Sequence, residues 1–255
     1  LIGATCFFRD AEAWNILQRD ILPCYIDELD EGEQLRVWVS ACATGEEAYS
    51  MAIIIDELVR QSGKNIQVKI FATDLDTNAL ETAAQGIYPE DIVNDISPER
   101  LERYFDDGDS HYRVKPWLRE MLIIAPHDLT KNAGFSKMHL VSCRNVLIYM
   151  QPRLQNQVLR LLHFSLASKG TLFLGSSETL GSLAEEFDLI NAKWRLFQRR
   201  RDSRLSLAPI GRQTIFNPLK TSRPTKTQQH QFDQLLDEVF KLCLPERRVS
   251  CFLVS

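Results

Sequence analysis

A turn with one glycine and two carboxylates is the part of this chain best suited to chemistry. Thr44-Gly45-Glu46-Glu47 follows an apolar run and opens a helical pattern, and a second apolar run ends at Asp74. A strand, a turn, a helix and a second strand that ends in an acid form a βαβ nucleotide-binding unit. Phosphates bind at helix N-termini, but Glu46 and Glu47 would repel them. The pattern therefore favours a nucleoside ligand with a cationic end and no phosphates.

S-Adenosylmethionine (SAM) fits this description, with a ribose diol for Asp74 and an amino group for a glutamate. An acid at the end of the second strand commonly accepts a ribose hydroxyl, and Asp76 is a separate candidate for capping the next helix. From spacing alone, Glu47 could equally form a capping box with Thr44. A nicotinamide dinucleotide is disfavoured, because the turn has no Gly-x-Gly and carries two glutamates.

The elements that would position these residues alternate between strand and helix. Strands are predicted at 35–42, 68–74, 121–127, 138–143, 171–176 and 195–199, and helices near 46–62, 77–84 and 152–167. Apolar strands separated by amphipathic helices predict an α/β fold with a mostly parallel sheet covered on both faces. A further N-terminal helix would carry Trp14, Leu17 and Ile21, with Asp10 as its N-cap and Pro23 ending or kinking it.

Residues 86–119 interrupt this alternation with a long polar stretch. Connections in α/β units are commonly ~2 to 6 residues long, so we expect this excursion to be functional. Its pattern predicts a short helix near 98–105 and a hairpin around Gly108.

Composition excludes several classes of function. The net charge of −4 over 255 residues gives no electrostatic footprint for nucleic acid, and the apolar segments are too short to span a bilayer. Six cysteines without Cys-x-x-Cys spacing predict free thiols and no metal site. We therefore expect a soluble, cytoplasmic protein. The chain starts at Leu1 without a signal peptide, so we interpret it as an internal part of a longer chain.

Six short motifs occur in order along residues 1–200: Thr5-Cys6-Phe7-Phe8-Arg9-Asp10, Ala43-Thr44-Gly45-Glu46-Glu47-Ala48-Tyr49-Ser50, Ala72-Thr73-Asp74-Leu75-Asp76, Gly86-Ile87-Tyr88, Cys143-Arg144-Asn145-Val146-Leu147-Ile148-Tyr149 and Gly175-Ser176-Ser177-Glu178. Together they resemble the CheR-type chemoreceptor methyltransferases, which methylate receptor glutamates with SAM. The resemblance implies a class I SAM-dependent methyltransferase fold, Rossmann-like, with an inserted β-subdomain at about 86–120 that meets the receptor. In two respects the chain departs from the family: His127-Asp128-Leu129 stands where Asn is common, and the small preceding helical domain is missing.

The resemblance also implies roles for individual residues. Arg9 and Tyr149 would be catalytic and hold the substrate carboxylate. The cofactor, or its product S-adenosylhomocysteine, would be held by Thr5, Arg9, Gly45, Glu47, Asp74, Asp128, Leu129, Arg144 and Asn145. Three alternatives stay open: Arg9 could pair with Asp10 or Glu12, Asp128 could serve a turn, and Tyr149 could be a core tyrosine with a satisfied hydroxyl.

Methylation of a glutamate requires no general base, because a carboxyl with a pKa of ~4.3 is already an anion at neutral pH. The carboxylate oxygen must instead lie ~3 to 3.5 Å from the methyl carbon. We expect Phe7 and Phe8 to line a pocket of low dielectric that favours the loss of charge. The implied partner is the cytoplasmic helical bundle of a chemoreceptor. The alternative is a catalytically idle SAM-binding scaffold or sensor module.

Two segments outside the implied catalytic core carry further expectations. Residues 201–230 predict a linker, and 231–255 predict an amphipathic helix and a strand that resemble the start of a PAS-like domain, as in CheB/CheR hybrid proteins. A plain helix packed on the catalytic domain is the alternative. The loop Asp106-Asp107-Gly108-Asp109-Ser110-His111 carries three acids, so it is a poor partner for the acidic tether peptide that some members bind by β-augmentation, and we expect receptor recognition without a tether. A plain solvated hairpin tip is the alternative. The receptor's identity and the oligomeric state stay open.

Overall fold

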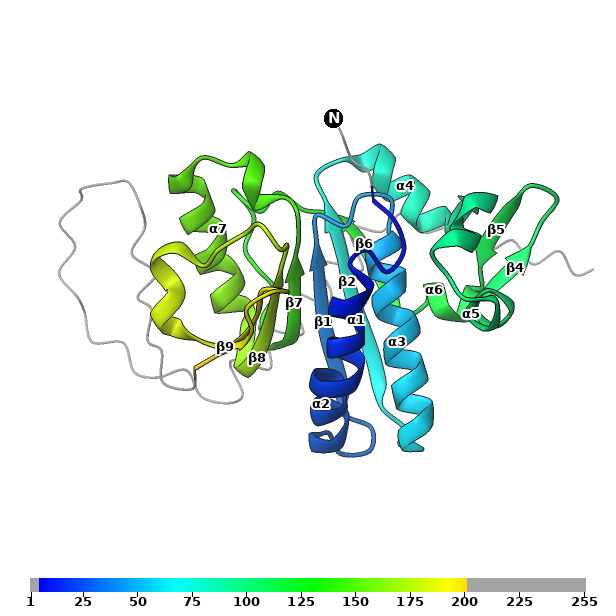
Figure 1. Cartoon of the computed structure of the whole chain (residues 1–255), viewed down its shortest axis with the longest axis horizontal. Helices are drawn as coiled ribbons and strands as arrows, with labels where there is room; N and C mark the ends of the chain where they lie inside the picture. Colours follow the sequence, from blue (N-terminus) through cyan, green and yellow to red (C-terminus); the bar gives the residue numbers. More distant parts are fainter. Residues whose placement is uncertain (1–4, 201–255) are drawn as a thin grey trace, which may run out of the picture. The chain divides into compact units, whose positions relative to one another are not determined.

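The computed structural model describes residues 5–200 (Figure 1). The predicted linker at 201–230 and the predicted helix and strand at 231–255 lie outside the described residues.

A mostly parallel sheet forms the centre of the described part of the chain. Its strands, in spatial order, are β6 (Leu122–Pro126), β2 (Gln67–Asp74), β1 (Gln34–Ser40), β7 (Met138–Cys143), β8 (Leu166–Leu174), β10 (Leu196–Arg199) and β9 (Phe187–Asn191). The pairs from β6 to β8 are parallel, whereas β10 is antiparallel to both β8 and β9. The predicted α/β class with a mostly parallel sheet is confirmed.

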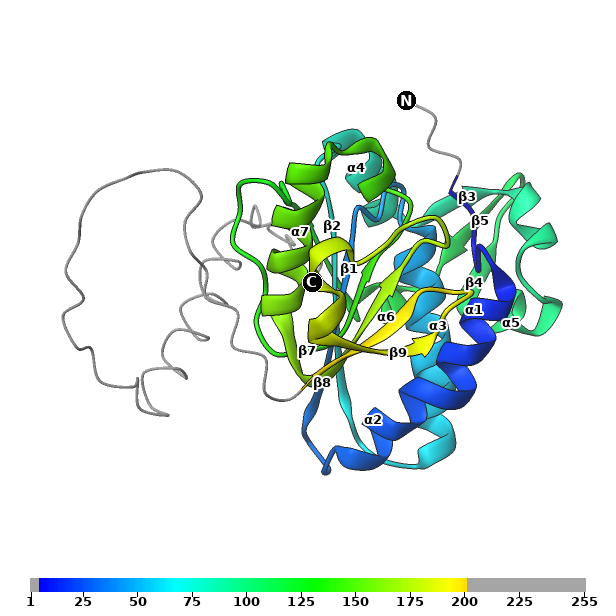
Figure 2. The same cartoon turned by 60° about the vertical axis from the view of Figure 1, so that its left-hand side comes forward.

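Helices cover both faces of this sheet, as Figure 2 shows for α1 to α3 on one side and α7 on the other. The main helices are α3 (Glu46–Ser62), α4 (Thr77–Gln85) and α7 (Pro152–Ser165), with short 3-10 turns η3 (Leu147–Tyr149) and η4 (Gly181–Glu186). Side chains of β1 alternate between the two faces. Val37 and Val39 join the core beneath α1 to α3, and Trp38 contacts Phe135 on the other face. Both faces are therefore buried, as continuous apolar strands predict.

The N-terminal helical segment bends at a π-helical turn. It consists of α1 (Ala11–Ile16), the π turn η1 (Leu17–Ile21) and α2 (Leu22–Glu28). Pro23 lies in the first turn of α2, where a helix needs no backbone N–H donor, so it does not end the helical segment; a kink at this residue stays a prediction. Asp10 stands at the predicted N-cap position of α1, but the expected capping by its side chain is wrong. Asp10 has a left-handed backbone and makes no capping hydrogen bond, because its carboxylate pairs with Arg144 instead.

The excursion after α4, called the insertion below, forms a small second sheet whose apolar side chains join the main core. It contains β3 (Ile87–Pro89), the 3-10 turn η2 (Glu90–Asn94), α5 (Pro98–Tyr104), β4 (Phe105–Asp107), β5 (His111–Val114) and α6 (Pro116–Arg119). The strands form an antiparallel sheet in the order β3-β5-β4, which confirms the predicted helix and hairpin. The Val114 N–H donates to the Gly86 carbonyl at 2.8 Å, so the insertion enters and leaves at one point.

Two details of the sheet differ from the prediction. β8 begins at Leu166, directly after α7, whereas the sequence predicts a start at 171 and a helix that runs to 167. The start of β8 is polar and holds Lys169 at φ 62°, so it lacks the apolar signal. β9 was not predicted, because it exposes most of its residues and lies at the edge of the sheet. Within the described residues, no helix has the length and apolarity to cross a bilayer.

Candidate active site

A cavity of about 920 Å³ lies at the carboxyl ends of the central strands. Open α/β sheets place their ligands at this edge, where the strand order reverses around β1. Its lining contains most of the predicted site residues, namely Thr5, Arg9, Glu47, Asp74, Arg144, Asn145 and Tyr149. The structure therefore brings together residues that are up to 144 positions apart in the sequence.

The turn between β1 and α3 forms one wall of the cavity. Ala41 and Ala43 have positive φ values of 54° and 48°, and Gly45 has a φ of 98°. A Cβ atom on Gly45 would lie 2.8 Å from the Cβ of Ala83, so only glycine allows α4 to approach this closely. Gly45 thus shapes the wall although it does not line the cavity.

The capping box suggested by Thr44 and Glu47 is not formed. Gly45 is the N-cap residue of α3 and provides no side chain. The Thr44 hydroxyl donates to the Glu46 carboxylate, and Glu47 binds elsewhere. Burial raises the pKa of Glu46, while hydrogen bonds from Thr44 and Thr5 oppose that rise. Because Thr44 binds Glu46, Glu47 makes no cap and lines the cavity instead.

Glu47 shares a guanidinium with Asp10. Its Oε1 accepts the Ser142 hydroxyl at 2.5 Å, and its Oε2 lies 3.3 Å from Arg144 Nη1. The same guanidinium lies 2.6 Å from the Asp10 carboxylate and 4.4 Å from the ring centre of Phe173. Two carboxylates around one cation leave a net negative charge at the cavity wall. That charge suits a ligand with an amino group.

The side chain of Arg144 is only 1% exposed, although the residue lines the cavity. Its contacts with Asp10 and Glu47 therefore occupy a guanidinium that the sequence assigned to the cofactor. Burial of an ion pair is tolerated only when hydrogen bonds compensate for lost hydration, and here Arg144 also donates to the Arg9 carbonyl at 3.1 Å. This residue joins the N-terminal segment to the end of β7.

Asp74 is held in place by two backbone donors. Its carboxylate accepts the N–H of Ala43 at 2.8 Å and the N–H of Asp76 at 2.9 Å. Asp76 in turn accepts the N–H groups of Asn78 and Ala79, so its predicted role as the N-cap of α4 is confirmed. The acid predicted to bind ribose is thus fixed at the end of β2, where it lines the cavity.

Arg9 is exposed and lines the cavity, while the two aromatic residues before it are buried. The expectation that Phe7 and Phe8 line the pocket is wrong, because both rings pack into the core instead. Trp14 contributes to the lining and donates its indole N–H to the Arg9 carbonyl at 2.8 Å.

The acids offered as alternative partners of Arg9 are engaged elsewhere. Asp10 pairs with Arg144, and Glu12 lies 2.5 Å from Lys193.

Tyr149 lies at the mouth of the cavity and is 74% exposed, so its interpretation as a core tyrosine is wrong. It follows Asn145, whose backbone is left-handed at φ 58°. The loop that contains both residues is shaped by Glu178, which is 3% exposed. The Glu178 carboxylate accepts the N–H groups of Gly175, Val146 and Leu147 at 2.6, 2.9 and 2.7 Å.

This role of Glu178 was not predicted from the sequence. The available signal was the motif Gly175-Ser176-Ser177-Glu178, to which no function was assigned. A Cβ atom on Gly175 would lie 2.8 Å from the Asn145 nitrogen, so the glycine lets the two loops pack together.

Asp128 and Leu129 do not line this cavity. The Asp128 carboxylate accepts the N–H and hydroxyl of Thr130 and lies 3.0 Å from Lys131. The Thr130 hydrogen bonds, followed by Lys131, lower the pKa of Asp128 to about 2. Asp128 therefore stabilises a turn, and a cofactor contact of Asp128 or Leu129 stays a prediction. In the described part of the chain, no group of three or more His, Cys, Asp or Glu residues could hold a metal ion.

Comparison with known proteins identifies clear relatives. Residues 3–196 match the family model described as "CheR methyltransferase, SAM binding domain". An "Uncharacterized 104.1 kDa protein in hypE 3'region" of Rhodobacter capsulatus is 37% identical over 201 residues, which are 79% of this chain and 21% of that protein. "Chemotaxis protein methyltransferase 1" of Pseudomonas aeruginosa is 36% identical over 191 residues, which are 73% of this chain and 69% of that protein. "Chemotaxis protein methyltransferase Cher2" of Pseudomonas putida is 35% identical over the same length and shares of each chain.

Proposed function

Because the chain belongs to the CheR methyltransferase family, and is a SAM-dependent methyltransferase of chemotaxis, we propose how its site acts on a receptor. In this proposal the acceptor is a glutamate side chain on the cytoplasmic helical bundle of a chemoreceptor, and the protein acts in the cytoplasm. The observation that carries the proposal is the placement of Arg9 and Tyr149 at the mouth of the cavity that Asp74 and Glu47 line.

The cavity wall suits SAM in charge and in hydrogen-bonding groups. Asp74 would accept the ribose hydroxyls, since its carboxylate is already oriented by two backbone donors. Glu47 would accept the amino group, because the Glu47 and Asp10 carboxylates outnumber the single guanidinium of Arg144 between them. SAM supplies, when bound, the electrophilic methyl group on its sulfonium centre.

Arg9 and Tyr149 would act on the acceptor rather than on a proton. The guanidinium of Arg9 attracts the glutamate carboxylate, which is an anion at neutral pH and needs no base. The Tyr149 hydroxyl can donate to one carboxylate oxygen and so direct the other at the methyl donor. The ester product is neutral and loses its attraction to Arg9, which favours release.

An experiment with labelled SAM tests this proposal. The protein is incubated with methyl-labelled SAM and receptor-containing membranes from its own source, and labelled receptor peptides are treated with mild base. We expect label that is released as methanol, because glutamate methyl esters are base-labile. Binding of SAM without any label transfer would instead support the idle scaffold, against which the presence of Arg9 and Tyr149 at the cavity already argues.

A further inference from the structure

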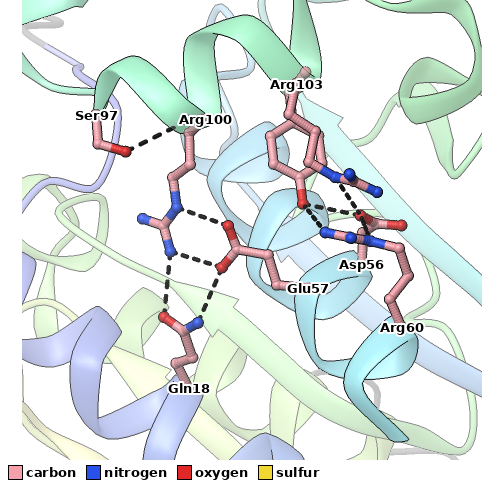
Figure 3. A network of polar contacts seen from close by, with 8 residues as sticks. Gln18, Asp56, Glu57, Arg60, Ser97, Arg100 and Arg103 are labelled. Atoms are coloured by element: carbon pink, nitrogen blue, oxygen red, sulfur yellow. Dashed lines mark hydrogen bonds and ion pairs between the residues drawn. The ribbon is translucent and has the colours of Figure 1, made fainter. Parts of the chain in front are cut away.

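The insertion is joined to the catalytic core by a polar network centred on Arg100 of α5 (Figure 3). The Arg100 guanidinium donates to both carboxylate oxygens of Glu57 on α3, at 2.9 and 2.8 Å. Gln18 of η1 completes the network, donating to Glu57 at 3.0 Å and accepting from Arg100 at 3.3 Å. Ser97 caps the start of α5 by accepting the Arg100 N–H. A bidentate pair of this kind fixes the orientation of the guanidinium plane as well as its position.

The face of this guanidinium covers Phe8, the residue before Arg9. The Arg100 carbon Cζ lies 4.5 Å from the centre of the Phe8 ring, within the range of a cation–π contact. The ring also meets Trp14 edge to face at 5.8 Å, and the Phe8 N–H donates to the Ser50 hydroxyl at 2.9 Å. Phe8 is thus held from three sides.

Phe8 needs such support because its backbone is left-handed, with a φ of 49°. A bulky side chain is an outlier in this region, and the conformation persists only when the surroundings enforce it. The direction of the chain at Phe8 decides where the next residue, Arg9, enters the cavity.

We propose that Arg100, oriented by Glu57 and Gln18, is a positioning residue that fixes Phe8 and through it the place of Arg9 at the cavity mouth. This inference rests on the proposed role of Arg9 toward the acceptor carboxylate. It makes the insertion a structural part of the active site.

A second network between the same two helices provides a matched control. Arg103 of α5 lies 3.9 Å from Asp56 of α3, and Asp56 also accepts the Tyr104 hydroxyl at 2.9 Å and pairs with Arg60 at 2.8 Å (Figure 3). Among the described residues, no contact of this second network reaches Phe8. Arg103→Gln therefore loosens α5 on α3 without touching the N-terminal segment.

The first measurement needs no enzymatic turnover. The Trp14 indole N–H donates to the Arg9 carbonyl, so its NMR signal reports the position of Arg9 in the protein alone. We expect Arg100→Gln to shift and broaden this signal and Arg103→Gln to leave it unchanged. Arg100→Lys should give an intermediate shift, since it keeps the charge and loses the planar bidentate contact. An unmoved signal in Arg100→Gln, or an equal shift in Arg103→Gln, would overturn the proposal.

The second measurement follows methyl transfer to receptor membranes. Arg100→Gln should lower kcat by roughly ten- to a hundredfold, because small displacements of a positioning group have effects of this size. Arg103→Gln should keep kcat close to the wild-type value, and equal losses in the two variants would refute a specific role for Arg100. If Arg100→Gln does not fold, Glu57→Gln removes the same ion pair with little change of shape and takes its place. A wild-type protein without transfer activity would refute the proposed function, whereas the Trp14 signal would still test the role of Arg100.

Discussion

The Glu178 carboxylate accepts the backbone N–H of Leu147 at 2.7 Å and thereby ties the chain after β8 to the loop that carries Tyr149. The carboxylate is buried, and it serves two further backbone donors on Val146 and Gly175. Hydrogen bonds to an ionised acceptor are stronger than neutral ones, so one side chain holds the whole loop.

Glu178→Gln should therefore destabilise the protein and disturb the loop. The amide keeps the shape but brings an N–H₂ group against backbone donors, which costs about 1 to 3 kcal/mol of unfolding free energy. Urea unfolding measures this loss, and kcat should fall with it. Glu185→Gln at an exposed position is the control, with an expected change below about 0.5 kcal/mol. Equal stabilities of the two variants would contradict the role of Glu178.

Asp74→Ala should weaken SAM binding. The lost charge-assisted bond is worth about 1.5 to 3 kcal/mol, or roughly one to two decades in Kd by calorimetry. Asp27→Ala is the control, because Asp27 is exposed, lies outside the cavity lining and should leave Kd unchanged. Unaltered affinity in Asp74→Ala would remove the ribose assignment, and a loss in Asp128→Ala would support the predicted cofactor contact of that residue.

Tyr149→Phe should lower kcat while the affinity for SAM stays nearly the same. An interaction made mainly in the transition state gives this split. Because Tyr149 is 74% exposed, the loss of its hydroxyl should not change the melting temperature. Full turnover in the Phe variant would show that the hydroxyl does not orient the substrate.

Two glycines at opposite ends of α3 separate backbone strain from crowding. Gly63 has a φ of 68° and open space where a Cβ would lie, so Gly63→Ala should lose only about 1 to 2 kcal/mol. Gly45→Ala is strained at a φ of 98° and has an additional overlap of its Cβ with Ala83, which adds about 1 to 3 kcal/mol. The free energy of unfolding, measured in urea, should be clearly lower for Gly45→Ala than for Gly63→Ala. Equal values would show that α4 moves away freely.

His163 should make the protein less stable in mild acid. Burial, and next the positive charge of Arg199, lower its pKa to about 4. The unfolded chain binds the proton near pH 6.5, so stability is full above that pH and falls as the pH drops from 6.5 toward 4. Replacement by Phe removes this titration. Between pH 7.5 and 5, wild type should lose up to about 2 kcal/mol more than His163→Phe. Parallel pH profiles for the two proteins would exclude His163 as the cause.

Local patterns in the sequence were sufficient for most of the fold. The strands at 68–74 and 138–143 and the helix at 46–62 agree with the structure within a residue or two, because their apolar residues are continuous or follow the helical period. The capping role of Asp76 was predictable for the same reason, since a cap acts within one turn of helix.

Pairings between distant residues could not be predicted in this way. Asp10 has the residue type and spacing of an N-cap, yet a guanidinium 134 positions away takes its carboxylate. The resemblance assigned Arg144 to the cofactor, and only the tertiary structure shows that two carboxylates surround it. Tyr149 follows an apolar run that suggests burial, yet it is exposed, in a loop whose backbone N–H groups donate to the distant Glu178.

The hydrogen bond between Val114 and Gly86 closes the insertion at its base, so replacing the insertion by that of a relative would not change the strand order of the main sheet. A transplanted insertion would, however, have to bring its own equivalents of Arg100 and of Phe105, whose ring meets Phe7 edge to face at 5.7 Å. Chimaeras between relatives should therefore retain methyl transfer only when these two inward-facing positions travel with the graft.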